Sequence, residues 1–277
     1  MIDAHVHFWN PARGDDILIL RREPSLARLS MPSDLLPAMA AAGVTGAVAI
    51  QSAPDSQETD HLLAICEPVA KVLAVVGWID LAAPDASRAI EALARRPKVT
   101  GVRAMLNRID APDWLPSDRV RPGLAALAQA GLTLDLIARA DHVPSILAVA
   151  NALPHLAIVV DHGATAPIRH GDMDAWSDAI ARLGAETRTF TNFSGLAEEA
   201  APDWSVDRLE PAFRHLLASF GPELIMWASN WPVIDLRGGY ARWVSASREL
   251  LDRTGLNGEE RRMIEEDTAK RFYRGLD

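Results

Sequence analysis

The sequence predicts a (β/α)₈ TIM barrel, and three observations carry that prediction. Eight short runs rich in Val, Ile, Leu and Ala recur along the chain, and most are followed by a longer segment with apolar residues at helical spacing. Several runs lack polar alternation, as expected for parallel strands that are covered on both faces. The length of 277 residues suits a fold that commonly uses about 250 residues. We therefore expect a single barrel domain over residues 1–277.

The expected strands are short and widely spaced, which leaves room for a helix after each of them. They are Ala4–Phe8, Val44–Gln51, Val72–Asp80, Thr100–Leu106, Leu132–Ile137, Ala157–Asp161, Thr189–Phe193 and Leu224–Ala228. An open doubly wound sheet would usually carry a Gly-rich dinucleotide loop after its first strand. The sequence has His5-Val6-His7-Phe8-Trp9 there, so the barrel is favoured.

The expected helices have apolar residues at the spacing of an amphipathic helix. They are Asp34–Ala42, Glu58–Ala70, Ala86–Arg96, Arg121–Ala130, Val143–Ala152, Met173–Arg182, Asp207–Phe220 and Tyr240–Asp252. A final amphipathic stretch, Glu259–Tyr273, is expected to be an extra helix that closes one end of the barrel.

Composition excludes several classes of function. The formal net charge of −9 argues against nucleic acid as a partner, because binding phosphates needs clustered Lys and Arg. Cys66 is the single cysteine, so an internal disulfide and a thiolate zinc site are both excluded. The N-terminal residues do not resemble a secretory signal, and apolar runs such as Val72–Val76 are far too short to span a membrane. A cytoplasmic protein is expected, and an oligomer is left open.

The first expected strand carries two histidines, His5 and His7. Because side chains alternate along a strand, both should point to the same face, into the barrel, while Val6 points toward the helices. Two imidazoles that converge in a barrel mouth suit a metal site or an electrophile. The alternative is a hydrogen-bonded pair of core histidines.

Other polar residues stand where catalytic groups of a barrel are found, at the carboxyl ends of strands. The sixth strand runs into Asp161-His162, which places a third histidine at the level of the first two, and His170 follows in a long loop that could reach a substrate. Asp161 is expected to orient a neighbour. The eighth strand is followed by Asn230, whose amide can hydrogen-bond but is a very poor general base.

Three further residues are candidates for substrate binding. An inward-pointing Arg103 on the fourth strand would be costly to bury unless it bound a carboxylate or polar oxygens. Substrate binding is slightly favoured for it over a structural ion pair. Gln51 and Trp78 also lie near strand ends, where packing and loop hydrogen bonds are equally plausible roles.

Taken in order along the chain, these motifs resemble the amidohydrolase-2 family. The resemblance lies in Ile2-Asp3-Ala4-His5-Val6-His7-Phe8-Trp9, Gly101-Val102-Arg103, Asp161-His162, Ser194-Gly195-Leu196, Ser229-Asn230-Trp231-Pro232-Val233 and the closing Asp267-Thr268-Ala269-Lys270-Arg271-Phe272-Tyr273. It covers the whole chain. Within the family, the sequence is most similar to hydrolases of L-fuconolactone, L-rhamnonolactone and 2-pyrone-4,6-dicarboxylate.

The resemblance implies the roles of several residues around a bound lactone. His5, His7 and His162 would polarise the carbonyl or hold a divalent metal, and position 230 would hold the group that activates water. His5 and His7 are the implied metal ligands. If the site holds a divalent metal, zinc is the metal expected. The alternative is a site that works without a metal.

The sequence departs from the family at position 230, where the family usually has aspartate and this chain has Asn230. Three explanations compete: a natural variant with another base (His162, His170 or Asp161), an engineered replacement of aspartate, or a barrel that binds without turnover. A second departure is Asn192, where relatives often carry lysine.

The hypothesis from sequence is a hydrolase that opens a small lactone, either a sugar-acid lactone or a related carboxylated ring. An activated water attacks the carbonyl, while histidines, Arg103 or a metal stabilise the oxyanion. The alternatives are a decarboxylase of the same superfamily and a non-catalytic ligand-binding barrel.

Overall fold

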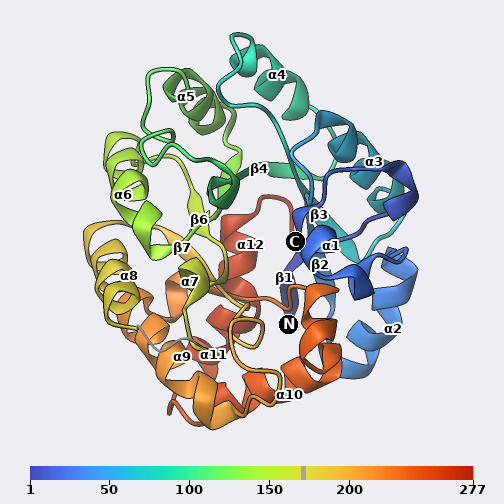
Figure 1. Ribbon diagram of the computed structural model, residues 1–277, viewed down its shortest axis with the longest axis vertical. Helices are drawn as coiled ribbons and strands as arrows, with labels where there is room; N and C mark the ends of the chain where they lie inside the picture. The colour runs from blue at the N-terminus through green and yellow to red at the C-terminus, as the bar shows by residue number, and fades with distance from the viewer. Residues whose placement is uncertain (170–172, 277) are drawn as a thin grey trace.

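The predicted barrel is confirmed in a computed structural model, which describes residues 1–169 and 173–276. In this part of the chain eight parallel strands follow one another in the order β1 to β8, and helices surround them (Figure 1). The strands are β1 (Ile2–Val6), β2 (Gly46–Ile50), β3 (Val72–Gly77), β4 (Val99–Met105), β5 (Thr133–Ile137), β6 (Ile158–Val160), β7 (Phe190–Phe193) and β8 (Ile225–Trp227). Each strand overlaps a run that the sequence predicts, with shorter or shifted ends.

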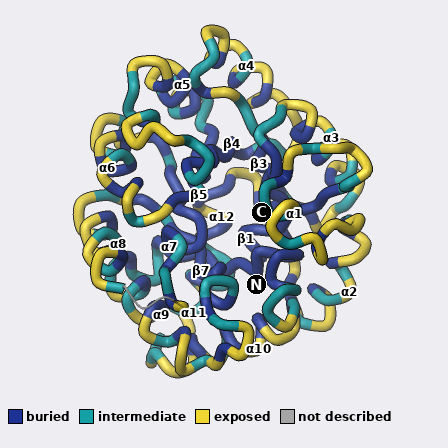
Figure 2. Tube along the Cα trace, in the orientation of Figure 1, coloured by how far each residue is buried: buried dark blue, intermediate teal, exposed yellow. Residues whose placement is uncertain are grey.

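The outer layer follows the predicted order. Its helices are α2 (Pro32–Ala42), α3 (Ser56–Cys66), α4 (Ala86–Leu93), α5 (Arg121–Ala130), α6 (Val143–Ala152), α8 (Asp174–Glu186), α9 (Val206–Phe220) and α10 (Gly239–Asp252). Their apolar faces pack on the outside of the strands, so the chain is most buried at its centre and most exposed on the outer turns (Figure 2). Among the described residues, no helix is both long and apolar enough to cross a bilayer.

Some segments differ from the prediction. The last stretch is not one α-helix: a π-helical turn at Met263–Asp267 separates α11 (Gly258–Arg262) from α12 (Thr268–Phe272). Before α2 the chain forms short turns that periodicity did not predict, η1 (Pro11–Arg13), α1 (Leu18–Arg22) and η2 (Pro24–Leu26). Further single turns are η3 (Leu106–Arg108), η4 (Ala140–His142), α7 (His162–Thr165), η5 (Pro222–Leu224) and η6 (Val233–Arg237). Such pieces are too short to show a hydrophobic period.

An irregularity in β1 sets the direction of the histidine pair. Ile2 and Ala4 pack in the barrel interior, whereas Val6 belongs to the cluster between strands and helices. The register with β2 shifts between Asp3 and Val6, as it does at a β-bulge, where an extra residue re-aims the side chains that follow. Because of this register shift, the consecutive residues Ala4 and His5 both face inward.

The barrel closes where β1 meets the segment after β8. The amide of His7 donates to the carbonyl of Trp231 at 2.7 Å, and the amide of Asn230 donates to the carbonyl of His5 at 2.9 Å. The buried Asp3 carboxylate accepts from the amide of Ser229 at 2.8 Å. This seam fixes the first and last strand ends in one register.

One end of the barrel is filled by the C-terminal segment. Ala269, Phe272, Tyr273 and Leu276 pack against interior residues of the strands. The hydroxyl of Tyr273 donates to the buried carboxyl of Asp135 at 2.6 Å. The predicted closing role of this segment is confirmed, and it leaves the carboxyl ends of the strands as the end where a ligand can enter.

Candidate active site

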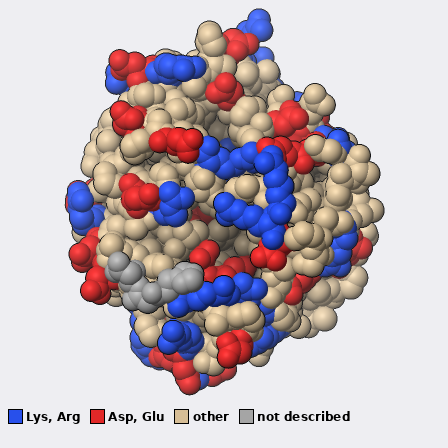
Figure 3. Space-filling model, viewed as in Figure 1, with Lys and Arg blue, Asp and Glu red and all other residues tan. Residues whose placement is uncertain are grey.

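A cavity of about 260 Å³ lies at the carboxyl ends of the strands. Four of the residues predicted from the sequence line it: His7, Arg103, His162 and Asn230. Basic side chains gather round the hollow on this face of the molecule (Figure 3), and Arg22 and Arg237 are among its lining residues. The volume is at the small end for ligand pockets, which suits a small molecule.

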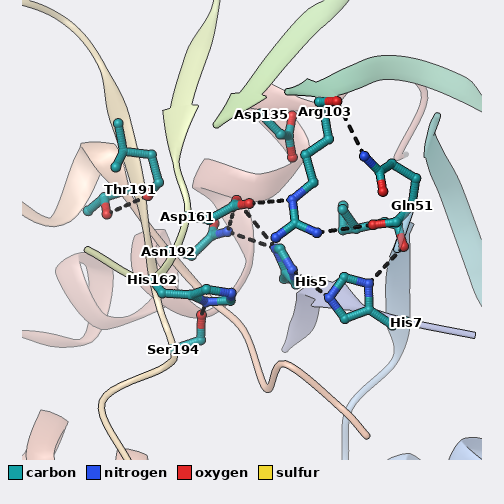
Figure 4. Close-up of polar contacts among 12 residues, drawn as sticks. His5, His7, Gln51, Arg103, Asp135, Asp161, His162, Thr191, Asn192 and Ser194 are labelled. Atoms are coloured by element: carbon teal, nitrogen blue, oxygen red, sulfur yellow. Dashed lines mark hydrogen bonds and ion pairs between the residues drawn. The ribbon is translucent and has the colours of Figure 1, made fainter. Parts of the chain in front are cut away.

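His5 and His7 are in contact, as their shared orientation predicts. Their Nε2 atoms are 3.1 Å apart, and Nδ1 of His7 lies 2.9 Å from the carbonyl oxygen of Ile50 (Figure 4). That carbonyl only accepts, so Nδ1 of His7 carries a proton and Nε2 has a free lone pair. Burial lowers the pKa of both rings well below 6.5, so they are neutral at pH 7. His5 then donates from Nε2 to His7.

The third corner of this network is the buried carboxylate of Asp161. Arg103 donates from Nε to Asp161 at 2.8 Å and from one NH₂ group to the carbonyl of Gln51 at 3.0 Å. The side-chain amide of Asn192 donates to Asp161 at 3.1 Å and lies 3.2 Å from Nδ1 of His5. Figure 4 shows these groups converging from β2, β4, β6 and β7. Asp161 accepts hydrogen bonds from Arg103 and Asn192, and Arg103 has both an ion pair and a place in the cavity wall.

His162 is held by an unusual backbone. It begins α7, in which all four residues, 162 to 165, have φ between 52° and 56°, a left-handed turn that non-glycine residues rarely adopt. The indole of Trp176 donates to the carbonyl of Gly163 at 2.7 Å and holds the turn in place. Nδ1 of His162 lies 2.7 Å from the hydroxyl of Ser194. The other ring nitrogen is left for the cavity.

Asn230 also has a left-handed backbone, with φ of 59°, a conformation that Asn and Asp tolerate best among the non-glycine residues. Its side-chain amide donates to Oε1 of Glu198 at 2.9 Å. Glu198 lines the same cavity, and burial raises the pKa of its carboxyl to about 7. Glu198 was missed in the sequence. Its place in the loop after β7, at the carboxyl end of a strand, is the signal that could have found it.

The remaining predicted residues that the structure describes are not brought to the cavity wall. His5 and Gln51 are fully buried behind it, and Gln51 donates to the carbonyl of Arg103 at 3.4 Å. Trp78 lies after β3, with its amide donating to the hydroxyl of Thr59 at 2.9 Å. His170 lies outside the described residues. Substrate binding by Gln51, Trp78 and His170 stays a prediction.

The histidine pair offers part of a metal site. Two nitrogen ligands of a tetrahedral zinc ion stand about 3.3 Å apart, close to the 3.1 Å between the Nε2 atoms of His5 and His7. Yet the described residues gather no group of three or more His, Cys, Asp or Glu around such an ion. Catalytic zinc usually has three protein ligands. The described residues therefore supply two of the three protein ligands that a catalytic zinc usually has, and no chemical step below is derived through a metal.

Known proteins resemble this chain over its whole length. The amidohydrolase family pattern matches residues 2–275. An L-fucono-1,5-lactonase from Burkholderia ambifaria is 36% identical over 276 residues, which covers 99% of this chain and 95% of that protein. An L-fucono-1,5-lactonase from Burkholderia multivorans is 29% identical, with coverage of 98% and 95%.

The structural comparison agrees with the sequence comparison. The crystal structure of an amidohydrolase from Burkholderia multivorans with bound zinc superposes with a TM-score of 0.91 and 28% identity, and 98% of each chain is covered. The family match over almost the full length and the 36% identity decide the assignment. The chain belongs to the amidohydrolase family.

Proposed function

We propose that the protein hydrolyses a small lactone of a sugar acid, with a 1,5-lactone of the L-fuconolactone type as the first candidate. The observation that carries this proposal is the 36% identity to an L-fucono-1,5-lactonase over 99% of the chain. The cavity supports it, because it is small and combines neutral imidazoles, an arginine and carboxyl groups at the mouth of a barrel.

The residues around the cavity suit hydrolysis of a cyclic ester. A water molecule attacks the carbonyl carbon, negative charge develops on the carbonyl oxygen, and the ring oxygen leaves as a hydroxyl group. Arg103 and a ring N–H of His162 are the donors available to that oxygen. His5 has no exposed surface and acts through His7, whose ring it holds by the contact at 3.1 Å.

Zinc content tests how the histidine pair behaves toward metal. We expect the purified protein, after dialysis against metal-free buffer, to retain well below one equivalent of zinc, because His5 and His7 supply two ligands and site affinity rises with ligand number and charge. Elemental analysis by mass spectrometry measures the retained zinc. Retention of a full equivalent that His7→Asn abolishes would contradict this expectation.

A panel of lactones tests the proposed function. We expect acid release from L-fucono-1,5-lactone and related sugar-acid lactones at rates far above spontaneous opening, measured by continuous pH-indicator assay. 2-Pyrone-4,6-dicarboxylate serves as the carboxylated comparison. Carbon dioxide release from aromatic acids without lactone opening would instead establish a decarboxylase. Ligand binding without turnover on any lactone would establish a binding barrel.

A further inference from the structure

The reaction needs a group that takes a proton from the attacking water, and Asn230 is a very poor base. We propose that Glu198 is the general base of the hydrolysis and that the Asn230 amide orients its carboxylate. This inference rests on the proposed lactone hydrolysis.

The buried carboxyl groups of Asp161 and Asp135 already have hydrogen-bond partners in the barrel interior. Asp161 accepts from Arg103 and Asn192, and Asp135 accepts from Tyr273 and Thr133. Neither Asp161 nor Asp135 lines the cavity. A base has to be within hydrogen-bond reach of the proton that it removes, so these two carboxyl groups are excluded by position.

Among the described residues, three glutamates line the cavity: Glu23, Glu198 and Glu199. Glu23 directly follows the short helix α1 rather than a strand of the barrel. Glu198 is the one that hydrogen-bonds to Asn230, at 2.9 Å. Its loop begins at Gly195, which packs directly on His162. Glu198 is thus tied to position 230, the position at which the resemblance predicts the water-activating group.

The carboxyl group of Glu198 has bonding capacity left. Its Oε2 atom is shielded from bulk solvent and has no hydrogen-bond partner among the described residues, and the same holds for Oδ1 of Asn230. Buried polar atoms are nearly always paired, so two such atoms on adjacent side chains of one cavity wall point to a missing polar partner. Rotation about the terminal torsion of Glu198 exchanges its two oxygens, and such torsions are soft.

The basicity of Glu198 suits the task. Burial raises the pKa of its carboxyl to about 7, a direction that Glu199 reinforces and that Asn230 and the nearby Arg237 oppose. The carboxyl is therefore about half ionised at neutral pH, close to the optimum for a general base. His7 and His162 are weaker bases, because burial holds the pKa of each ring well below 6.5.

The proposed step balances without a redox partner. The Glu198 carboxylate removes one proton from water as the water oxygen bonds to the carbonyl carbon. The bond between that carbon and the ring oxygen then breaks, and the ring oxygen takes a proton from the Glu198 carboxylic acid. The product is the open hydroxy acid, and Glu198 returns to its ionised form when it gives up that proton.

Kinetics of Glu198→Gln on the best lactone test the proposal. General-base catalysis typically contributes about 10²–10⁴-fold, so we expect kcat to fall by about that factor with little change in KM. For the unmodified protein, kcat/KM should rise with pH through a midpoint near a pKa of about 7, because the base works only when ionised. This limb should be absent in Glu198→Gln. Glu91→Gln, on the exposed face of α4, is the matched control and should behave like the unmodified protein.

A double variant separates chemistry from folding. Glu198→Gln combined with Asn230→Asp exchanges amide and carboxylate between two side chains that touch, and it should recover at least about tenfold in kcat over Glu198→Gln, part of the general-base contribution. A double variant with no recovery overturns the pairing of Glu198 with Asn230. Circular dichroism and the thermal midpoint show that each variant folds.

The outcomes distinguish this proposal from the proposed function. An unmodified protein that opens no lactone overturns both. An active protein whose Glu198→Gln variant keeps its rate within about threefold, or keeps the limb near a pKa of about 7, overturns the role of Glu198 alone. Loss of that limb in His162→Asn but not in Glu198→Gln would assign the base to His162.

Discussion

Replacing Asp161 with asparagine is expected to lower the free energy of unfolding by about 3–5 kcal/mol, the usual cost of removing one partner from a buried ion pair. The Arg103 side chain is 3% exposed and that of Asp161 is fully buried, with 2.8 Å between Nε and the carboxylate. Arginine stays charged in proteins, so a neutral amide in place of the carboxylate would leave a buried cation uncompensated. Urea unfolding of the two proteins measures the difference.

A surface pair provides the control for this prediction. Asp118 and Arg121 make an ion pair at 2.6 Å, but their side chains are 88% and 66% exposed. Asp118→Asn removes the same charge and should cost less than about 1 kcal/mol. If Asp118→Asn and Asp161→Asn lowered the free energy of unfolding equally, burial would not determine how much the interior ion pair contributes to stability.

The second large effect is expected from Gly195→Ala. Gly195 has φ of 76°, and an added Cβ would lie 2.5 Å from Cβ of His162. The clash involves an atom fixed to the backbone, so His162 and its left-handed turn must shift. We expect a loss of about 2–5 kcal/mol in stability from backbone strain and overpacking together. Lactone turnover should also fall at least about tenfold, because His162 would be displaced from its working geometry.

Gly255→Ala isolates the strain from the clash. Gly255 has nearly the same φ, 74°, but an added Cβ would meet nothing within 4 Å. It should therefore cost about 1–2 kcal/mol and leave turnover unchanged. Denaturant unfolding and steady-state kinetics on both variants check the pair. A Gly195→Ala variant that matches Gly255→Ala in stability and rate would contradict the close packing of Gly195 on His162.

Much of the barrel could be predicted from the sequence. Parallel strands that are covered on both faces consist of short runs of consecutive apolar residues, and such runs can be recognised locally. The segment from Glu259 to Tyr273 could be predicted as amphipathic, but its π-helical turn depends on contacts with β8 and η5 that no periodicity records. The left-handed turn at His162 likewise could not be predicted from the sequence. Only one of its four residues is glycine, and tertiary packing holds the other three in the left-handed conformation.

The candidate site could be predicted in part for a similar reason. Alternation along one strand brings His5 and His7 together, yet their inward direction depends on the register shift between Asp3 and Val6. Glu198 was not predicted because it lies in a loop. In a loop, neither hydrophobic periodicity nor motif spacing indicates which side chain points toward the cavity. Its meeting with Asn230 joins residues 32 positions apart and is decided by the three-dimensional structure alone.

The seam between β1 and the segment after β8 also bears on how activity is acquired during synthesis. His5 and His7 leave the ribosome well before Asn230, whose amide pairs with the carbonyl of His5. A nascent or truncated chain that ends before residue 230 holds both histidines on a strand without its closing neighbour. Regain of turnover during refolding therefore requires the meeting of β1 with the segment after β8, which the formation of helices alone does not report.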